Sequence, residues 1–196
     1  MATPGILTSI HGKLFGISEG KRLVSGGLNP GVLPVIAYTN TAASTAVSNT
    51  TTETLFDKSY SIPANSLRVG QLIRIRYQVI ATATNSTDTL AVKLYIGGLT
   101  GTALISHAAT DVADNNVVSG EYEVILRTVG ASGTMVGCGT YKSVPAAEGT
   151  MTIKDDILAS TAINTTAAQV IGVSATWSVA SASNSCRLDF LRVEIA

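Results

Sequence analysis

The side chains that could do chemistry are few, and they stand far apart in the sequence. His11 and His107 lack any spacing typical of metal ligands, so each ring is expected to be solvated or locally hydrogen-bonded. Cys138 and Cys186 fall in separate predicted strands without a CxxC spacing, which favours two buried free thiols over a disulfide. From the spacing of these four residues, we expect no metal site.

Carboxylates and amides gather at two places. Asp155 and Asp156 are adjacent, but neighbouring side chains on an extended chain point apart, so they could not share a proton. The loop from Asp111 to Asn116 offers the hard oxygen ligands that Ca²⁺ prefers. Its spacing does not match a calcium loop, and turns rich in Asp and Asn form for backbone reasons alone. We therefore expect loop charges and no metal ion.

Signatures of enzymes and of sugar sites are also weak. No Gly-x-Ser-x-Gly elbow, phosphate loop or dinucleotide fingerprint is present. Aromatic residues make up only 5% of the chain, which disfavours a carbohydrate site built on exposed rings. Tyr38, Tyr95 and Tyr141 remain candidate platforms, although Tyr is an ordinary strand residue. We expect that the protein is not an enzyme, with no catalytic residue and no cofactor.

The charge balance and the lengths of the apolar runs argue against two classes of partner, nucleic acids and membranes. The 196 residues include 13 basic and 13 acidic side chains, and charged residues are 13% of the chain, against about a quarter in average soluble domains. Such a chain has no basic stripe to follow a phosphate backbone, so no nucleic-acid partner is expected. No apolar run reaches the roughly 18 residues that cross a membrane. Glycines interrupt the apolar N-terminus, which argues against a secretory signal.

Apolar residues alternate with polar ones through most of the chain, as in half-buried strands, and no stretch keeps a helical period for three turns. In residues 72–80, for example, Ile73, Ile75 and Val79 share one face. This strand and residues 89–97 are joined by turn residues, which predicts a hairpin with one apolar face. Eight strands are predicted after residue 52, around 54–60, 71–83, 89–97, 102–107, 117–129, 134–143, 169–180 and 186–195.

Eight antiparallel strands with mixed connection lengths favour a jelly roll over an immunoglobulin-like sandwich, which has seven strands and usually a Cys…Trp…Cys spacing that Trp177 does not fit. The predicted fold class is all-β, an eight-stranded antiparallel jelly-roll sandwich with an extended N-terminal arm. Residues 1–52 are assigned to the arm and a polar linker, and residues 53–196 to the sandwich. Residues 151–164 are ambiguous, either an irregular crossing or a short strand around 151–153.

The N-terminal segment is too apolar for a solvated tail, and residues 39–52 are almost wholly Thr, Ser, Ala and Asn. Two interpretations stay open, an arm that lies on a neighbouring copy or a shell and a hairpin packed on its own domain. On the first interpretation, the contact residues are Ile6, Leu7, Ile10, Leu14, Phe15 and Ile17.

The last strand, residues 186–195, is apolar on both faces if it is regular, with Leu191, Val193 and Ile195 together on one of them. Such a strand is either central between packed sheets or buried in a subunit contact, so these three residues are candidate contacts. A bulge at Phe190–Leu191 is the alternative, because it would turn every apolar side chain inward and leave Arg192 and Glu194 in water.

Three stretches resemble virion proteins of tailed bacteriophages. The opening TPGILTSIHGK, residues 3–13, resembles the start of small virion proteins found beside capsid genes. Residues 61–75, SIPANSLRVGQLIRI, and residues 94–98, LYIGG, are similar to β-sandwich modules of phage head-decoration and tail-fibre proteins. The apolar C-terminal strand also occurs in those proteins.

The resemblance implies a jelly-roll capsid decoration, or cement, protein that is made in the host cytoplasm and sits on the outer capsid surface of the virion. Its implied partners are the major capsid protein and two further copies of itself in a homotrimer, with no nucleic acid and no membrane. The alternative is a tail-fibre or receptor-binding module that recognises host surface glycans.

Overall fold

The computed structural model describes residues 35–83, 87–112, 115–144 and 151–196. Residues 36–195 form one compact unit. Its regular structure is almost entirely β, and the one helical element in the described ranges is a short 3-10 turn, η1 (Gly98–Thr100).

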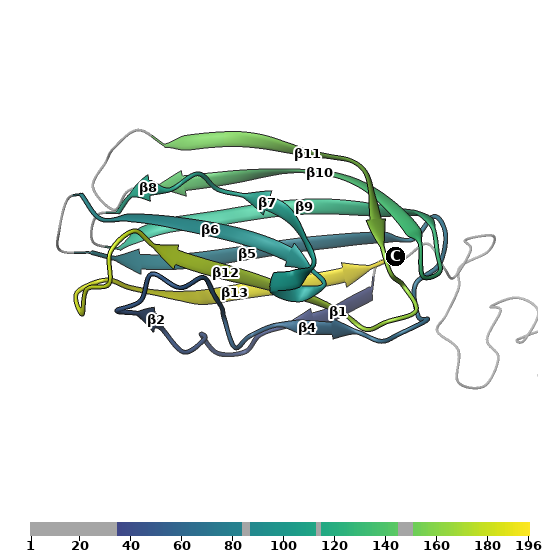
Figure 1. The fold of residues 1–196 in the computed structure, drawn as a ribbon, viewed down its shortest axis with the longest axis horizontal. Coiled ribbons are helices and arrows are strands. Elements are labelled where there is room, and N and C mark those ends of the chain that lie inside the picture. Colours follow the sequence, from purple (N-terminus) through teal and green to yellow (C-terminus); the bar gives the residue numbers. More distant parts are fainter. Residues whose placement is uncertain (1–34, 84–86, 113–114, 145–150) are drawn as a thin grey trace, which may run out of the picture. The chain divides into compact units, whose positions relative to one another are not determined.

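Two antiparallel sheets make up this unit (Figure 1). Sheet A has seven strands, which in spatial order are β1 (Val35–Thr39) with β2 (Val47–Ser48), β13 (Ser185–Ile195), β5 (Leu72–Thr82), β9 (Asn116–Thr128), β10 (Gly133–Val144) and β11 (Thr152–Ile163). Sheet B has six strands, which are β3 (Thr54–Leu55) with β4 (Tyr60–Ile62), β12 (Gln169–Trp177), β6 (Thr89–Ile96), and β7 (Thr102–Ser106) with β8 (Thr110–Asp111).

The chain alternates between the sheets in the manner of a jelly roll. It passes from β1 and β2 in sheet A to β3 and β4 in sheet B, returns to β5, crosses to β6, β7 and β8, returns to β9, β10 and β11, and ends with β12 and β13 in opposite sheets. The predicted all-β jelly-roll class is confirmed. The hairpin of β10 and β11 extends sheet A beyond this pattern.

The core lies between the two sheets and is built from the alternating residues. On β5, the side chains of Ile73, Ile75 and Val79 are fully buried, and the same is true of Val124 on β9 and Val173 on β12. Each such side chain contributes roughly 1.5–3 kcal/mol relative to exposure to water. The face predicted for Ile73, Ile75 and Val79 is therefore correct.

The hairpin predicted for β5 and β6 is wrong. β5 pairs with β13 and β9 in sheet A, whereas β6 pairs with β12 and β7 in sheet B. Alternation and turn residues are the same for a hairpin and for a connection that crosses the core, so these local signals could not separate the two. β9 and β10, by contrast, do form a hairpin, with Gly130 at φ 116 in its turn.

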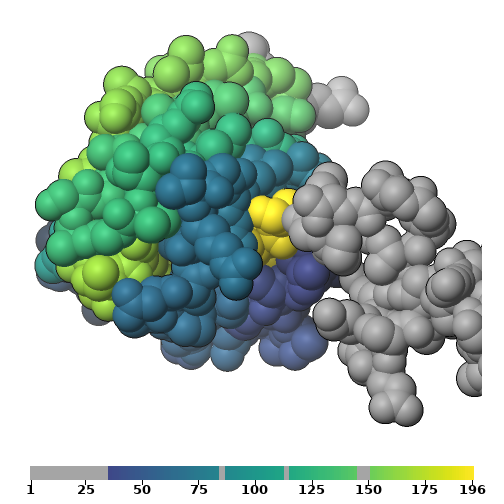
Figure 2. All heavy atoms as spheres, turned by 90° about the vertical axis from the view of Figure 1, so that its right-hand side faces the viewer, coloured from purple at the N-terminus to yellow at the C-terminus, as the bar shows by residue number. Residues whose placement is uncertain are grey.

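The boundary predicted at residue 52 also differs from the structure. Val47 is buried and β2 pairs with β13, so part of the predicted linker belongs to sheet A. Between β1 and β2, the backbone amides of Asn40 and Ser44 donate to carbonyls of β13, those of Leu191 and Leu188, at 3.1 and 2.8 Å. Figure 2 shows the purple atoms of β1 beside the yellow atoms of β13. The polar composition of residues 39–52 therefore did not reveal this pairing, because backbone amides and carbonyls form the bonds to β13.

Residues 152–163, which the sequence left between a crossing and a short strand, form the full strand β11. It pairs with β10 from Gly133↔Ile163 to Ser143↔Thr152, with a register shift between Met135 and Gly137. This shift breaks the alternation of β11, and much of the strand is exposed, so its apolar residues show no regular period.

Candidate contact surfaces

Six of the predicted contact residues, Ile6, Leu7, Ile10, Leu14, Phe15 and Ile17, lie outside the described residues. The remaining three are on β13, and the structure corrects their role. Leu191 and Val193 are fully buried in the core, and Ile195 is partly buried against it. A subunit cannot reach Leu191 or Val193 while the domain is folded, so neither is a contact residue.

The bulge that decides the faces of β13 lies at Asp189. Leu188 pairs with Val79 and Phe190 pairs with Gln78, which leaves Asp189 without an opposite residue. The bulge thus turns Leu188, Leu191 and Val193 into the core and leaves Phe190 half-buried on the outer face of sheet A, the face turned away from sheet B.

This result differs from the predicted bulge at Phe190–Leu191, because Phe190 does not turn inward. Glu194 is not left in water either. It is buried, and its carboxylate contacts the Arg192 guanidinium at 2.5 Å and the Arg74 guanidinium at 3.6 Å.

Asn40 holds the bulge in place from β1. Its side-chain amide donates to the carbonyl of Asp189 at 3.0 Å, and its side-chain oxygen accepts from the backbone amide of Leu191 at 2.6 Å. On the other side of the bulge, the Ser44 hydroxyl accepts from the backbone amide of Leu188 at 2.9 Å. Two polar side chains of the predicted linker therefore satisfy the backbone groups that a bulge leaves unpaired.

An exposed apolar surface lies on β11 instead. Among the described residues β11 pairs with β10 alone, so it is an edge strand, and it lies at one border of sheet A in Figure 1. Ile157 has 78% of its area exposed and Ile153 has 49%. Long edge strands with exposed apolar residues readily pair with other chains.

Neighbouring strands continue this apolar surface. Ile157 stands opposite the exposed Cys138 on β10, and Val136, two residues along β10, stands opposite the exposed Ile125 on β9. We call these four residues together with Ile153 the β11 surface. No periodic signal in the sequence predicted this surface, because its five residues come from three strands.

The outer face of sheet A also carries a shallow depression of about 250 Å³, which we call the sheet A depression. It is formed where small residues of β9 leave room between larger neighbours on β5, β10 and β13. Its walls are the side chains of Arg76, Gln78, Ser119, Glu121, Thr140, Lys142 and Phe190.

Tyr77, His107 and Tyr141 pack together inside the sandwich. The Tyr77 hydroxyl and the His107 Nε2 atom are 2.6 Å apart, and the ring centroids of His107 and Tyr141 are 3.6 Å apart. Burial lowers the pKa of His107 to about 3 and raises the pKa of Tyr77 well above its usual value. The His107 ring is thus uncharged at neutral pH and fills the core.

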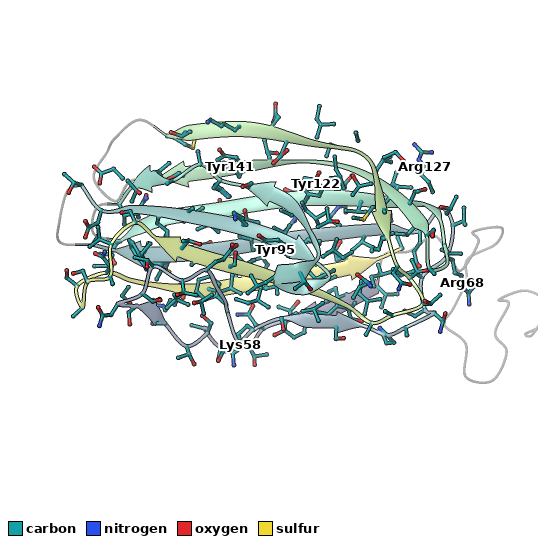
Figure 3. The ribbon with its side chains drawn as sticks, viewed as in Figure 1. Lys58, Arg68, Tyr95, Tyr122, Arg127 and Tyr141 are labelled. Atoms are coloured by element: carbon teal, nitrogen blue, oxygen red, sulfur yellow. The ribbon has the colours of Figure 1, made fainter. Side chains whose placement is uncertain are left out.

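Glycines make room for the tyrosine rings of this region. A Cβ atom at Gly120 would lie 2.4 Å from the Tyr77 ring, and one at Gly139 would lie 2.2 Å from the Tyr122 ring. Figure 3 shows Tyr122 and Tyr141 on the neighbouring strands β9 and β10. The space that these rings occupy is therefore closed to a ligand.

The three tyrosines predicted as platforms are not open rings. Tyr95 and Tyr141 are buried, and Tyr38 stacks on Tyr60 with a centroid distance of 5.8 Å. Tyr95, which is labelled in Figure 3, donates to the Glu53 carboxylate at 3.0 Å.

Glu53 ties the start of β3 to sheet B. Besides Tyr95, its carboxylate accepts from the Ser174 hydroxyl at 2.7 Å and contacts the Lys93 ammonium at 3.2 Å. Burial raises the pKa of Glu53, but the hydrogen bonds from Ser174, Lys93 and Tyr95 outweigh it and hold the pKa below its usual value. The hydrogen bonds and the ion pair of Glu53 thus connect the residue before β3 to β6 and β12.

The remaining residues with candidate chemistry do not come together. Asp156 accepts from the backbone amide of Ser106 at 3.4 Å, while Asp155 is exposed. Asn116 is buried near the Ser143 hydroxyl, and Asp111 is exposed. The described part of the chain holds no group of three His, Cys, Asp or Glu residues that could bind a metal ion.

Both cysteines are free, as predicted, but only Cys186 is buried. Burial raises the pKa of the Cys186 thiol to about 12, whereas Cys138 is exposed, contrary to the prediction. No helix in the described ranges is long and apolar enough to span a membrane.

Comparisons with known proteins give no family. No family model and no curated protein matches the chain. Among solved structures, it is similar to VP2 of infectious bursal disease virus, at 12% identity and a TM-score of 0.38 over 90% of this chain and 36% of that chain. The chain thus spans about a third of the length of that protein.

Two further structures are similar at the same level. The basic winged bean lectin has 8% identity and a TM-score of 0.35 over 72% of this chain and 78% of that chain. The CBM2 module of Dit from Lactobacillus casei phage J-1 has 15% identity and a TM-score of 0.33 over 69% and 67%. These are weak likenesses of fold, and the jelly-roll assignment rests on the order of the strands in the two sheets.

Proposed function

We propose that the protein is a structural component of a virion, a decoration or cement protein that binds the outer capsid surface and stabilises contacts between major capsid subunits. The single observation that carries this proposal is the β11 surface, an exposed apolar edge of sheet A that holds the most exposed large apolar side chain of the described residues, Ile157. The resemblance of residues 3–13 and 61–75 to phage virion proteins supports the same function.

The energetics of β11 favour a protein partner. Covering a largely exposed Ile side chain contributes roughly 1.5–3 kcal/mol, and Ile157 and Ile153 project from one face of the same strand. The free edge of β11 also presents backbone amides and carbonyls that an extended segment of another chain can pair with. A surface of this kind contributes binding energy without any reaction.

The first experiment measures binding to capsids of the phage that encodes the chain, prepared without this protein. Ile157→Lys places a charge in the β11 surface, and Val69→Lys is the matched control, because Val69 is 63% exposed and lies outside that surface. We expect Ile157→Lys to weaken co-sedimentation with capsids by at least about tenfold, and Val69→Lys to leave it unchanged. Equal binding by Ile157→Lys and the unchanged protein would refute the role of β11.

A second experiment tests the N-terminal residues. Deleting residues 1–27 removes Ile6 to Ile17, and we expect the truncated protein to remain folded but to lose capsid binding. A truncated protein that still decorates capsids would exclude these residues as the gripping arm. Solution mass measurement on the full chain tests the trimer, for which a mass about three times 20.2 kDa is expected.

A further inference from the structure

The sheet A depression combines side chains of opposite hydrogen-bonding character. Sheet register lines up Phe190, Gln78, Ser119 and Lys142 across four strands in one row. The next row places Arg76 beside Glu121 and Thr140. Hydroxyl, amide, carboxylate and cationic groups thus surround one hollow, which is the mixture that a ligand with many hydroxyl groups needs, because each hydroxyl both donates and accepts.

The pair of Arg76 and Glu121 is only partly used within the protein. The Nε and Nη2 atoms of Arg76 both contact the Oε1 atom of Glu121, at 2.8 and 2.5 Å. Both contacts reach the same carboxylate oxygen, and the two side chains are 47% and 49% exposed. One acceptor and one donor, held by their ion pair, are therefore available to adjacent hydroxyls of a ligand.

The bulge at Asp189 supplies the apolar wall. In a regular strand Phe190 would share the inward face of Leu188, but the extra residue turns it to the outer face, where it borders the depression. A half-buried aromatic ring beside polar groups suits the apolar C–H face of a sugar ring, which packs on the ring while its hydroxyls bond to the sides.

The charge of the depression distinguishes between sugars. Arg76 and Lys142 contribute two positive charges and Glu121 one negative charge, and Lys142 forms no ion pair with any described residue. An exposed, uncommitted ammonium group at the rim favours a ligand that carries a carboxylate.

We propose that the sheet A depression binds a carboxylate-bearing sugar residue, a uronic or sialic acid. Phe190 packs on the sugar ring, Glu121 and Arg76 bond to its hydroxyls, and Lys142 pairs with its carboxylate. This binding is separate from the β11 surface, although Ile153 stands next to Lys142. It also gives the alternative function, recognition of host glycans, a defined place on the fold.

The test uses the full chain in ligand-observed saturation-transfer NMR, followed by titration, with glucuronic acid, N-acetylneuraminic acid and glucose as probes. We expect saturable binding of at least one of the two acids, with an affinity for it about tenfold higher than for glucose. No saturable binding of either acid up to about 10 mM, or equal affinity for glucose and the acids, would overturn the proposal.

Two variants assign the roles. Lys142→Gln should weaken binding of the acid by about tenfold without changing glucose binding, whereas the control Lys154→Gln, on exposed β11 outside the depression, should change neither. Phe190→Leu keeps an apolar side chain at the bulge but removes the aromatic ring, and it should weaken binding of all sugars by about fivefold. Equal effects of Lys142→Gln and Lys154→Gln would also overturn the proposal. Capsid co-sedimentation of the same variants separates this result from the decoration role.

Discussion

β13 and β11 are two long strands of sheet A, but most apolar residues of β13 are buried whereas much of β11 is exposed. Both contain apolar residues that fail to alternate simply, and each has one register irregularity, at Asp189 in β13 and opposite Val136 in the pairing of β11 with β10. β13 lies between β5 and the pair of β1 and β2, whereas β11 has a strand on one side only within the described part of the chain. Apolar content alone therefore does not indicate an interface, because the neighbours of a strand decide whether its apolar residues are core or surface.

The largest difference between these strands should appear in stability. Leu191→Ala removes a fully buried side chain from β13 and should lower the free energy of unfolding by about 2–5 kcal/mol. Ile157→Ala on β11 should change it by no more than about 0.5 kcal/mol, because that side chain is 78% exposed. Urea unfolding of both variants measures this, and equal losses would show that β11 is also core.

Acid should lower the stability of the folded domain through His107 in its interior. The unfolded chain protonates His107 near its ordinary value of 6.5, while the folded pKa is about 3, so stability falls as the pH drops from 6.5 toward 3. The slope from this group is about 1.4 kcal/mol per pH unit, or about 3 kcal/mol by pH 4.

Urea unfolding of the unchanged protein and of His107→Gln, between pH 4 and pH 7, measures this loss. The variant should show a flatter dependence on pH, since Gln keeps a polar partner for the Tyr77 hydroxyl without titrating. The same slope in both proteins would contradict the assignment to His107.

The bulge of β13 can be weakened from outside the strand. Asn40→Ala removes the side-chain bonds to Asp189 and Leu191 and should cost about 1–3 kcal/mol of unfolding free energy. Thr39→Ala is a suitable control, because the Thr39 hydroxyl bonds only to the neighbouring carbonyl of Tyr38 and is exposed. If Asn40→Ala lost no more unfolding free energy than the control, the bulge would not depend on the Asn40 side chain.

The smallest effect is expected at Glu53, which lies on sheet B, away from both strands. Its folded pKa is lower than the ordinary 4.5, so its contribution is present above that value and is lost as the pH falls through the folded pKa. Glu53→Gln should reduce stability by no more than about 1 kcal/mol at pH 7, since the cluster is partly exposed. Thermal unfolding at pH 7 and pH 3 checks this, and the difference between the two proteins should shrink at pH 3.

The sites were harder to predict than the fold. Leu191 and Val193 were expected as contacts because a strand apolar on both faces has two explanations, and the bulge that selects one depends on Asn40, far away in the sequence. Phe190 was not recognised as a surface ring for the same reason. The residues of the sheet A depression come from four strands, so no spacing in the chain could reveal them.

The all-β class and the inward face of β5 followed from the sequence alone, because side-chain alternation is a local property of an extended chain. Only the tertiary structure decided that β5 and β6 face each other across the core, that β1 and β2 join sheet A, and that β11 is an exposed edge. Strand pairing joins residues distant in the chain, and its energy depends on which partner is available, which no local pattern records.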